Sequence, residues 1–277
     1  MGIDRMGLRG LWEREVITYS DETTDSSKVI LWMQARSLYA DIRIPRDMAP
    51  LPSDLCLDDM DRDSLAELAR CGGFGGTIRL QGSTCYWDRD VDWQPDTGVP
   101  DVAELALEGV DLIENGGACN GHQVWRRRTT PGCNTLGIRL RDAGDGRSGF
   151  LVAGEGRFVY VRGRLSELRP AASLGEVIDA SVDTGDVRRL FDAEVSYGTV
   201  GDDTTLLVTM STLPWQIGRD LGRLEGVAGE GDELITADQD HSGSARSVNW
   251  QVVGFEHDPS ADSTLVGGSS VADALRR

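Results

Sequence analysis

Residues 38–45 read Leu-Tyr-Ala-Asp-Ile-Arg-Ile-Pro, and aliphatic side chains alternate with more polar ones along them as far as the proline. This two-residue period is that of a β-strand, in which successive side chains point to opposite faces. The strand ends at Pro45, which has no amide proton to donate to a neighbouring strand. One face carries the aliphatic residues and the other the polar ones: Leu38, Ala40, Ile42 and Ile44, then Tyr39, Asp41 and Arg43.

Further short runs of extended character follow along the chain, with glycine, aspartate and proline between them. These runs are residues 29–32, 76–81, 83–93, 102–107, 111–115 and 122–128. Helix signals are few by comparison. Many short strands at regular spacing are typical of a sandwich or a barrel, so the chain is predicted to be all-β.

The two halves of the chain repeat the same order of parts. Each has a strand pair that ends in an aromatic-x-x-x-Arg stretch, then a short helix, then strands that close on a tryptophan. The segments Ser64 to Glu67 and Ser173 to Glu176 both have the spacing of a capping box, in which the two side chains satisfy free amides at a helix start. A repeat of this kind predicts two successive domains of the same architecture.

The repeat divides the chain into domains at residues 1–133 and 134–277. Each is expected to be a lipocalin-like antiparallel barrel with a short capping helix. In the second domain, residues 225–247 and the tail at residues 258–277 are rich in small and polar residues. Both segments are therefore expected to be flexible.

The charge of the chain limits its partners. There are 28 Lys and Arg residues against 46 Asp and Glu residues, which gives a net charge of −18. Such a charge repels phosphate groups, so neither nucleic acid nor an anionic membrane is an expected partner. Charged residues interrupt the N-terminal region where a signal peptide would lie, and apolar runs are too short for a membrane span. A cytoplasmic protein is expected.

The cysteines do not predict a disulfide framework or a zinc site. They are odd in number, lack C-x-x-C spacing and all lie in the first domain: Cys56, Cys71, Cys85, Cys119 and Cys133. Structural zinc sites and secreted disulfide scaffolds both need paired spacings. Reduced thiols are therefore expected.

Several short motifs in the first domain resemble those of a known group of proteins. The motifs are Trp32-x-Gln34, Tyr39-x-Asp41-Ile42-Arg43-Ile44-Pro45, Gly75-Gly76, Trp87-x-Arg89-x-Val91-Asp92 and Val124-Trp125. Together they resemble the two-barrel, lipocalin-like proteins that include the fungal kinase-interacting double-barrel family and its bacterial relatives. The resemblance covers mainly residues 12–128 and implies two tandem calycin-type barrels. The second domain departs from it, because Tyr160 stands where the first has Asp41, so a polar role of Asp41 does not carry over.

The polar face of residues 38–45 has two interpretations. In a small barrel the inward face is normally apolar, which would leave Tyr39, Asp41 and Arg43 in water. A barrel that holds a ligand, or that packs beside a second barrel, would instead turn this face inward. An Asp41–Arg43 pair in a low-dielectric interior could then orient a carboxylate or a carbonyl group.

Residues 85–93 alternate in the same way. One face would carry Cys85, Trp87, Arg89, Val91 and Trp93, and the other, expected to face water, Tyr86, Asp88, Asp90 and Asp92. Two tryptophans beside an arginine form an aromatic slot that suits a planar or anionic ligand. Ordinary packing of tryptophan on arginine is the alternative.

Histidine chemistry is limited to His122, His241 and His257, and the last two lie in or directly before the segments expected to be flexible. A metal site is therefore not expected. His122 is the candidate general base, and Glu114 in the preceding strand is its candidate partner for proton transfer near neutral pH. A surface histidine at a turn is the alternative.

These patterns predict a protein that binds an apolar or aromatic small molecule in a barrel and acts on it without a cofactor, as a cyclase, isomerase or lyase. The candidate catalytic residues are Asp41, Arg43, Glu114 and His122, and the candidate ligand-binding residues are Trp32, Gln34, Tyr39, Trp87, Arg89, Trp93 and Trp125. A non-catalytic carrier or a protein-interaction module is the alternative. No pattern fixes the substrate or the oligomeric state.

Overall fold

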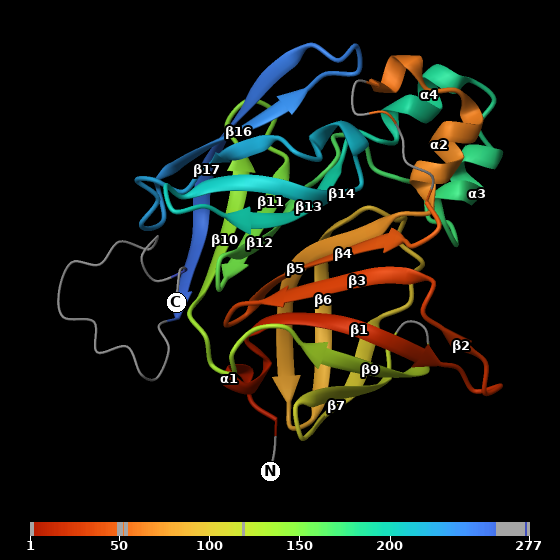
Figure 1. The fold of residues 1–277 in the computed structure, drawn as a ribbon. Helices are drawn as coiled ribbons and strands as arrows, with labels where there is room; N and C mark the ends of the chain where they lie inside the picture. Colours follow the sequence, from red (N-terminus) through yellow and green to blue (C-terminus); the bar gives the residue numbers. More distant parts are fainter. Residues whose placement is uncertain (1–2, 49–51, 53–54, 118–119, 259–274, 276–277) are drawn as a thin grey trace.

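The computed structural model describes residues 3–48, 52, 55–117, 120–258 and 275 (Figure 1). These residues form two closed antiparallel β-barrels of eight strands each, with a few short helices. The prediction of an all-β chain with two tandem barrels is confirmed. Figure 1 shows the first barrel in red to yellow-green below the second, which runs from green to blue.

In the first barrel, each strand pairs with the next along the chain, apart from a short strand at one end. Its eight strands, among the described residues, are β1 (Gly10–Thr18), β3 (Lys28–Gln34), β4 (Leu38–Pro45), β5 (Gly72–Gln81), β6 (Thr84–Asp92), β7 (Asp101–Glu108), β8 (Asp111–Gly116) and β9 (Gly121–Arg127). The short strand β2 (Thr24–Asp25) pairs with the end of β1. Helix α1 (Arg5–Leu8) precedes β1. Pairing of β1 with β9 closes the barrel.

The second barrel repeats this plan after the segment that links β9 to β10. Its strands are β10 (Thr135–Asp142), β11 (Ser148–Gly154), β12 (Arg157–Arg162), β13 (Glu194–Val200), β14 (Thr205–Ser211), β15 (Asp220–Arg223), β16 (Glu233–Gln239) and β17 (Ala245–Asp258). Pairing of β10 with β17 closes it.

One expectation for the second domain is wrong. Residues 225–247, expected to form a flexible loop, contain all of β16 and the start of β17, which pair with each other. Exposed and buried residues alternate along β16, where Leu234 and Thr236 are buried and Glu233 and Ile235 are exposed, which is the two-residue period of a strand. Of the tail at residues 258–277, Asp258 ends β17 and Leu275 is buried, while the rest lies outside the described residues.

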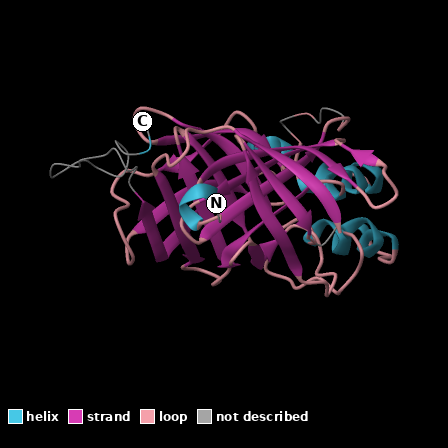
Figure 2. Cartoon of the chain, turned by 90° about the horizontal axis from the view of Figure 1, so that it is seen from below, coloured by secondary structure: helices cyan, strands magenta, loops and turns pink. Residues whose placement is uncertain are grey.

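The helices lie in equivalent places in the two halves. Helix α2 (Arg62–Ala69) lies between β4 and β5, and α3 (Leu174–Asp179) and α4 (Thr184–Arg189) lie between β12 and β13. The 3-10 turns are η1 (Leu57–Asp59) and η2 (Pro214–Gln216). Helix α2 packs on α3 and α4 at one end of the molecule (Figures 1 and 2). Across the described residues, the helices are too short or too polar to span a membrane.

The two predicted capping boxes have different outcomes. Ser173 caps α3 as expected, since its hydroxyl accepts a hydrogen bond from the amide of Glu176 at 3.2 Å. Helix α2 instead begins earlier, because the carboxylate of Asp61 accepts a hydrogen bond from the amide of Ser64 at 2.8 Å. Aspartate caps helices as well as serine does, so the earlier cap adds nearly a turn to the helix.

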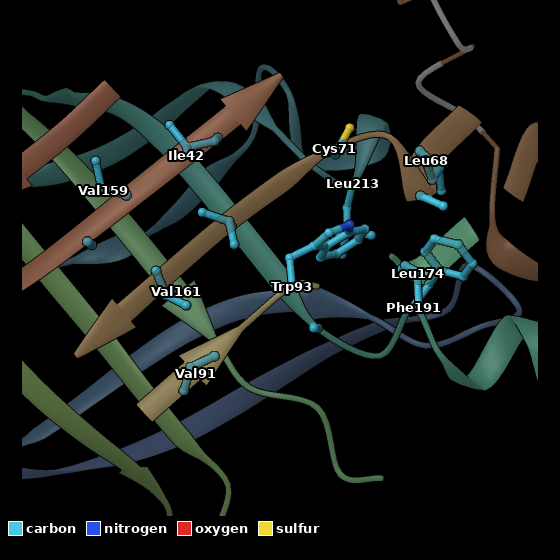
Figure 3. Close-up of a cluster of buried hydrophobic side chains, with 14 of the residues drawn as sticks. Ile42, Leu68, Cys71, Val91, Trp93, Val159, Val161, Leu174, Phe191 and Leu213 are labelled. Atoms are coloured by element: carbon cyan, nitrogen blue, oxygen red, sulfur yellow. The ribbon is translucent and has the colours of Figure 1, made fainter. Parts of the chain in front are cut away.

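The aliphatic face of β4 is covered by the second barrel and does not line the interior of the first. Leu38, Ala40 and Ile42 are buried in one cluster with Val159 and Val161 of β12 (Figure 3). This cluster, the inter-barrel core, forms where β3, β4 and β5 meet β11, β12 and β13. Strand β4 is therefore buried on both faces.

Glycines of β5 allow the two barrels to approach closely. A Cβ atom on Gly75 would lie 3.0 Å from the ring of Phe150 on β11. A Cβ atom on Gly73 would lie 2.8 Å from Val195 on β13 and 2.5 Å from the carbonyl oxygen of Asp41, and the φ angle of Gly73 is +147°. Glycine within a strand commonly marks such a close approach of backbone to another element.

The interiors of the two barrels differ in character. The second is filled by an apolar cluster that includes Leu151, Phe158 and Trp250. The first holds an aromatic cluster that includes Trp32 and Trp87, and charged side chains lie buried beside it. Both barrels bury charged side chains, but Arg162, Glu194 and Asp238 of the second form ion pairs with one another, whereas those of the first line a cavity, so the first barrel holds the candidate site.

Candidate functional site

Strand β4 turns its polar face into the first barrel. Asp41 is almost fully buried, and the Nε atom of Arg43 donates a hydrogen bond to its Oδ1 atom over 2.7 Å. The Tyr39 side chain is fully buried, and its hydroxyl has no hydrogen-bond partner among the described residues. Of the two interpretations of this face, the inward one is the observed one, because the second barrel covers the aliphatic face.

Strand β6 follows the predicted alternation only as far as Arg89. Trp87 and Arg89 point into the barrel, but a bulge opposite Gly75 and Gly76 then reverses the two faces. Such a bulge adds a residue to one strand and shifts its side chains to the other face. As a result, Val91 belongs to the inter-barrel core and not to the barrel interior.

The bulge overturns the placement of two further residues of this segment. Trp93, predicted to bind a ligand, is fully buried in the inter-barrel core, with its ring 5.7 Å from that of Phe191 (Figure 3). Asp92, expected to face water, is instead paired with Arg89 over 2.9 Å. Burial raises the pKa of Asp92, although Arg89 opposes this effect.

Two arginines share the aromatic ring of Phe74. The guanidinium carbon of Arg89 lies 3.8 Å from the ring centroid and that of Arg43 lies 4.6 Å from it. Each arginine is also paired with carboxylates, Arg43 with Asp41 and Arg89 with Asp92 and Asp101. Cation–π contacts and ion pairs together hold both guanidinium groups in place.

Glu114 is a second buried carboxyl group of the barrel interior, beside Asp41 in the lining of the same space. It accepts hydrogen bonds from Nε2 of Gln123 at 2.5 Å and from Nε1 of Trp125 at 3.0 Å. Burial raises the pKa of Glu114 to about 8, and the negative charge of Asp101 adds to this effect. The carboxyl group therefore keeps its proton at neutral pH.

The predicted pairing of His122 with Glu114 is wrong. His122 is exposed on the outside of the barrel, where its Nδ1 atom is hydrogen-bonded to Oδ1 of Asn115 at 2.8 Å. In the observed register, Asn115 lies opposite His122 and Glu114 lies opposite Gln123. The histidine and the glutamate therefore point to opposite faces of the sheet.

Three tryptophans form the apolar side of the site. The ring of Trp32 meets those of Trp87 and Trp125 edge to face, with centroid distances of 5.9 and 5.7 Å. Gln34 fixes Trp32, because its Oε1 atom accepts a hydrogen bond from the indole Nε1 at 3.1 Å. Gln34 in turn donates to the carbonyl of Leu38, so it supports the site and does not line it.

A small cavity, the inner cavity, lies among these side chains and has a volume of about 30 Å³. Eight of the predicted site residues line it: Trp32, Tyr39, Asp41, Arg43, Trp87, Arg89, Glu114 and Trp125. Phe74, Asp101 and Gln123, which the sequence did not single out, complete the lining. A space of this size holds one or two water molecules or the tip of a larger ligand.

A second and larger space, the outer cleft, lies next to the inner cavity and has a volume of about 560 Å³. Its charged lining residues are Lys28, Arg43, Arg70, Arg89 and Asp92, and residues 172–175 before and within α3 contribute one side. Arg43, Phe74 and Arg89 line both spaces and so stand between them.

Sequence reasoning missed the outer cleft because residues from distant parts of the chain form it. Gln94 shows how they are joined: its Nε2 atom donates to the carbonyl of Cys71 and its Oε1 atom accepts from the amide of Leu174 at 2.8 Å. One signal was present in the sequence. Lys28 is the single lysine beside 27 arginines.

Comparison with known proteins finds a similar fold but gives no information on the chemistry of the site. No protein-family model matches the chain, and no curated protein matches it in sequence. Its fold is similar to that of the uncharacterized protein YLR301w from Saccharomyces cerevisiae, with a TM-score of 0.51 and 11% sequence identity. The match covers 89% of this chain and 98% of the yeast chain. At this identity, the likeness concerns the fold alone.

Proposed function

We propose that the first barrel binds a small molecule across the inner cavity and the outer cleft, and that Glu114 exchanges a proton with it. The observation that carries this proposal is a buried carboxyl group on the wall of a polar cavity, which Tyr39 also lines with a hydroxyl that has no hydrogen-bond partner among the described residues. Polar groups that converge on a cavity in this way are typical of sites for small molecules.

The two spaces suit different parts of a ligand. The outer cleft, at about 560 Å³, has the volume of a small-molecule site, whereas the inner cavity, at about 30 Å³, admits only a few atoms. A ligand would therefore rest its body in the cleft, against Phe74, and place one polar end in the cavity. The Phe74 ring, which lines both spaces, favours a planar or apolar body.

The cavity supports proton transfer without a cofactor. Glu114 is protonated at neutral pH because its pKa is about 8, so it can donate a proton to a ligand atom and later take one back. The hydrogen bonds from Gln123 and Trp125 would stabilise the carboxylate that remains. The Asp41–Arg43 pair would orient the polar end of the ligand. Many cyclase, isomerase and lyase reactions use such a transfer.

A second candidate function is a non-catalytic carrier or a protein-interaction module. Two observations favour it: the small volume of the inner cavity, and the resemblance of residues 12–128 to the fungal kinase-interacting double-barrel family. Such a protein would use the barrels as a rigid scaffold.

Incubation of the full-length protein with a broad metabolite extract tests the proposal. Native mass spectrometry identifies what is bound, and liquid chromatography with mass spectrometry identifies what is consumed. The test variant is Glu114→Gln, which keeps the shape of the side chain. The matched control is Glu108→Gln, which changes an exposed glutamate on β7 of the same barrel.

The expected result is that the wild type and the control bind and deplete one metabolite, whereas Glu114→Gln binds it and leaves it unchanged. Binding by all three proteins without depletion would assign the carrier function instead. A wild type that binds no small molecule would overturn the proposal in favour of an interaction module.

A further inference from the structure

Lys28 has an unusual position for the single lysine of the chain. It is the first residue of β3, on the same face as Ile30 and Trp32, and it lines the outer cleft. The residue is half-buried, and its ammonium group donates a hydrogen bond to the carbonyl oxygen of Arg70 at 2.7 Å. The strand thus holds an amine at the entrance of the first barrel.

Lys28 differs from the other cations of the outer cleft in its surroundings. Arg70 is paired with Asp47 and Glu67 at 2.6 and 2.7 Å, and Arg43 and Arg89 are paired with aspartates. Within the described ranges of the chain, Lys28 forms no ion pair with a carboxylate. Burial lowers the pKa of Lys28, and the positive charge of Arg43 adds to this effect, while the negative charge of Asp25 opposes it.

Such a group has a free-energy cost in the protein without a ligand. A charged amine that is partly removed from water loses solvation, and a nearby arginine repels it. An anion bound beside Lys28 would offset both effects through a charge-assisted hydrogen bond. The outer cleft has room for such an anion next to the backbone of Gly72 and Gly73, which carry no side chain to block it.

We propose that Lys28 binds an anionic group of the ligand, a carboxylate or a phosphate, in the outer cleft. This inference rests on the proposed function and names the class of ligand. The charge of the outer cleft agrees with it, since four cationic residues and one aspartate line the cleft. An anion held at Lys28 would leave the rest of the ligand against Phe74, on the path to the inner cavity.

The single lysine makes a direct experiment possible. Full-length protein labelled with ¹³C at the lysine Cε atom gives one lysine signal in an NMR spectrum, and that signal reports on Lys28 alone. The probes are benzoate, phenyl phosphate and the uncharged benzamide, which share a planar ring and differ in charge. Dissociation constants are measured in parallel by calorimetry for the wild type and for Lys28→Gln, Lys28→Arg and Arg79→Gln. Arg79 is an exposed arginine of the same barrel that lies outside the cleft.

Benzoate, phenyl phosphate or both should shift the Lys28 signal, and benzamide should not; which of the two anions binds more tightly separates a carboxylate from a phosphate. Lys28→Gln should raise the dissociation constant of the bound anion by about tenfold or more, as expected for loss of a charged hydrogen bond. Lys28→Arg should restore most of the affinity, and Arg79→Gln should leave it unchanged.

Equal binding of benzamide and benzoate, with no effect of Lys28→Gln, would overturn the inference but leave small-molecule binding in the first barrel intact. An unchanged Lys28 signal with both anions at millimolar concentration would overturn it as well. The metabolite experiment described above depends on Glu114 and not on these probes, so it judges the proposed function separately.

Discussion

Glu114 of β8 and Trp125 of β9 lie on neighbouring strands, and the indole Nε1 atom of Trp125 donates a hydrogen bond to Oε2 of Glu114 over 3.0 Å. The indole is a donor only, so this bond holds the carboxyl group in one orientation in either protonation state. The Nε2 atom of Gln123 donates a hydrogen bond to the other carboxyl oxygen of Glu114, and the Oε1 atom of Gln123 accepts a hydrogen bond from Arg14 at 3.2 Å. Glu114 is therefore a buried acid whose orientation is fixed.

Stability should depend on pH through Glu114. The pKa of Glu114 is raised from 4.5 to about 8 in the folded protein, so between these values the folded chain keeps a proton that the unfolded chain has lost. The stabilising contribution is therefore complete below about pH 4.5 and falls as the pH rises toward 8, by on the order of 1 kcal/mol per pH unit. Glu114→Gln should flatten this dependence in urea unfolding at pH 5, 6, 7 and 8. Identical slopes for the variant and the wild type would contradict the buried, protonated carboxyl group.

Gly73→Ala should destabilise the protein by about 1–3 kcal/mol, because the new methyl group meets the carbonyl of Asp41 and the side chain of Val195. The strained φ angle of +147° adds to the cost. Gly229→Ala is the matched control, since a Cβ atom there has no neighbour within 4 Å. Thermal unfolding of both variants checks the prediction, and equal melting temperatures would show that the barrels do not need the glycine.

Arg162→Met should destabilise the second barrel by about 3–5 kcal/mol, because it leaves the buried Glu194 without a counter-charge and removes one of the two arginines paired with the buried Asp238. Arg162 is 2% exposed and lies 3.1 Å from Asp192, 3.3 Å from Asp238 and 3.6 Å from Glu194. Arg189→Met, which removes an exposed pair, should change stability by less than about 1 kcal/mol. Chemical denaturation of the two variants makes the comparison. A loss of similar size in both would argue against a buried charge network.

His122→Gln should leave both stability and metabolite depletion unchanged, to within about 0.5 kcal/mol in stability. The side chain is exposed and its hydrogen bond to Asn115 lies outside the barrel. If His122→Gln no longer depleted the metabolite while its circular dichroism spectrum matched that of the wild type, His122 would have to be counted as catalytic.

The alternation of residues 38–45 was enough to predict the strand but not the direction of its faces. Tyr39, Asp41 and Arg43 line the interior of the first barrel because Leu38 and Ile42 are covered by a second barrel encoded more than a hundred residues later. A strand buried on both faces has no solvent side, so the usual rule that polar residues point outward does not apply to it.

Two other differences have local causes. The bulge in β6 depends on pairing with Gly75 and Gly76 of another strand, so the reversal that places Trp93 in the inter-barrel core cannot be seen in the alternation of residues 85–93. The cap of α2 was misplaced because Asp61 and Ser64 are both good capping residues and only the surrounding packing decides between them.

Glu114 and His122 show the limit of sequence reasoning for the site. Both lie in predicted strands, but their relative orientation depends on the register of β8 and β9 to a single residue. A shift of the register by one residue would move each side chain of a strand to the opposite face of the sheet. Eight of the predicted site residues nevertheless meet at the inner cavity, because aromatic and charged residues that alternate with aliphatic ones within a strand share a face.

The inter-barrel core joins the same strands from each half, β3 to β5 from one and β11 to β13 from the other. An isologous dimer brings equivalent elements of its two subunits together in this way, but here both halves belong to one polypeptide. Because one polypeptide carries both barrels, dilution does not separate them, and their association does not depend on protein concentration. Because each barrel has its own stretch of sequence, the two need not be identical, so the second can have a filled interior while the first has a cavity.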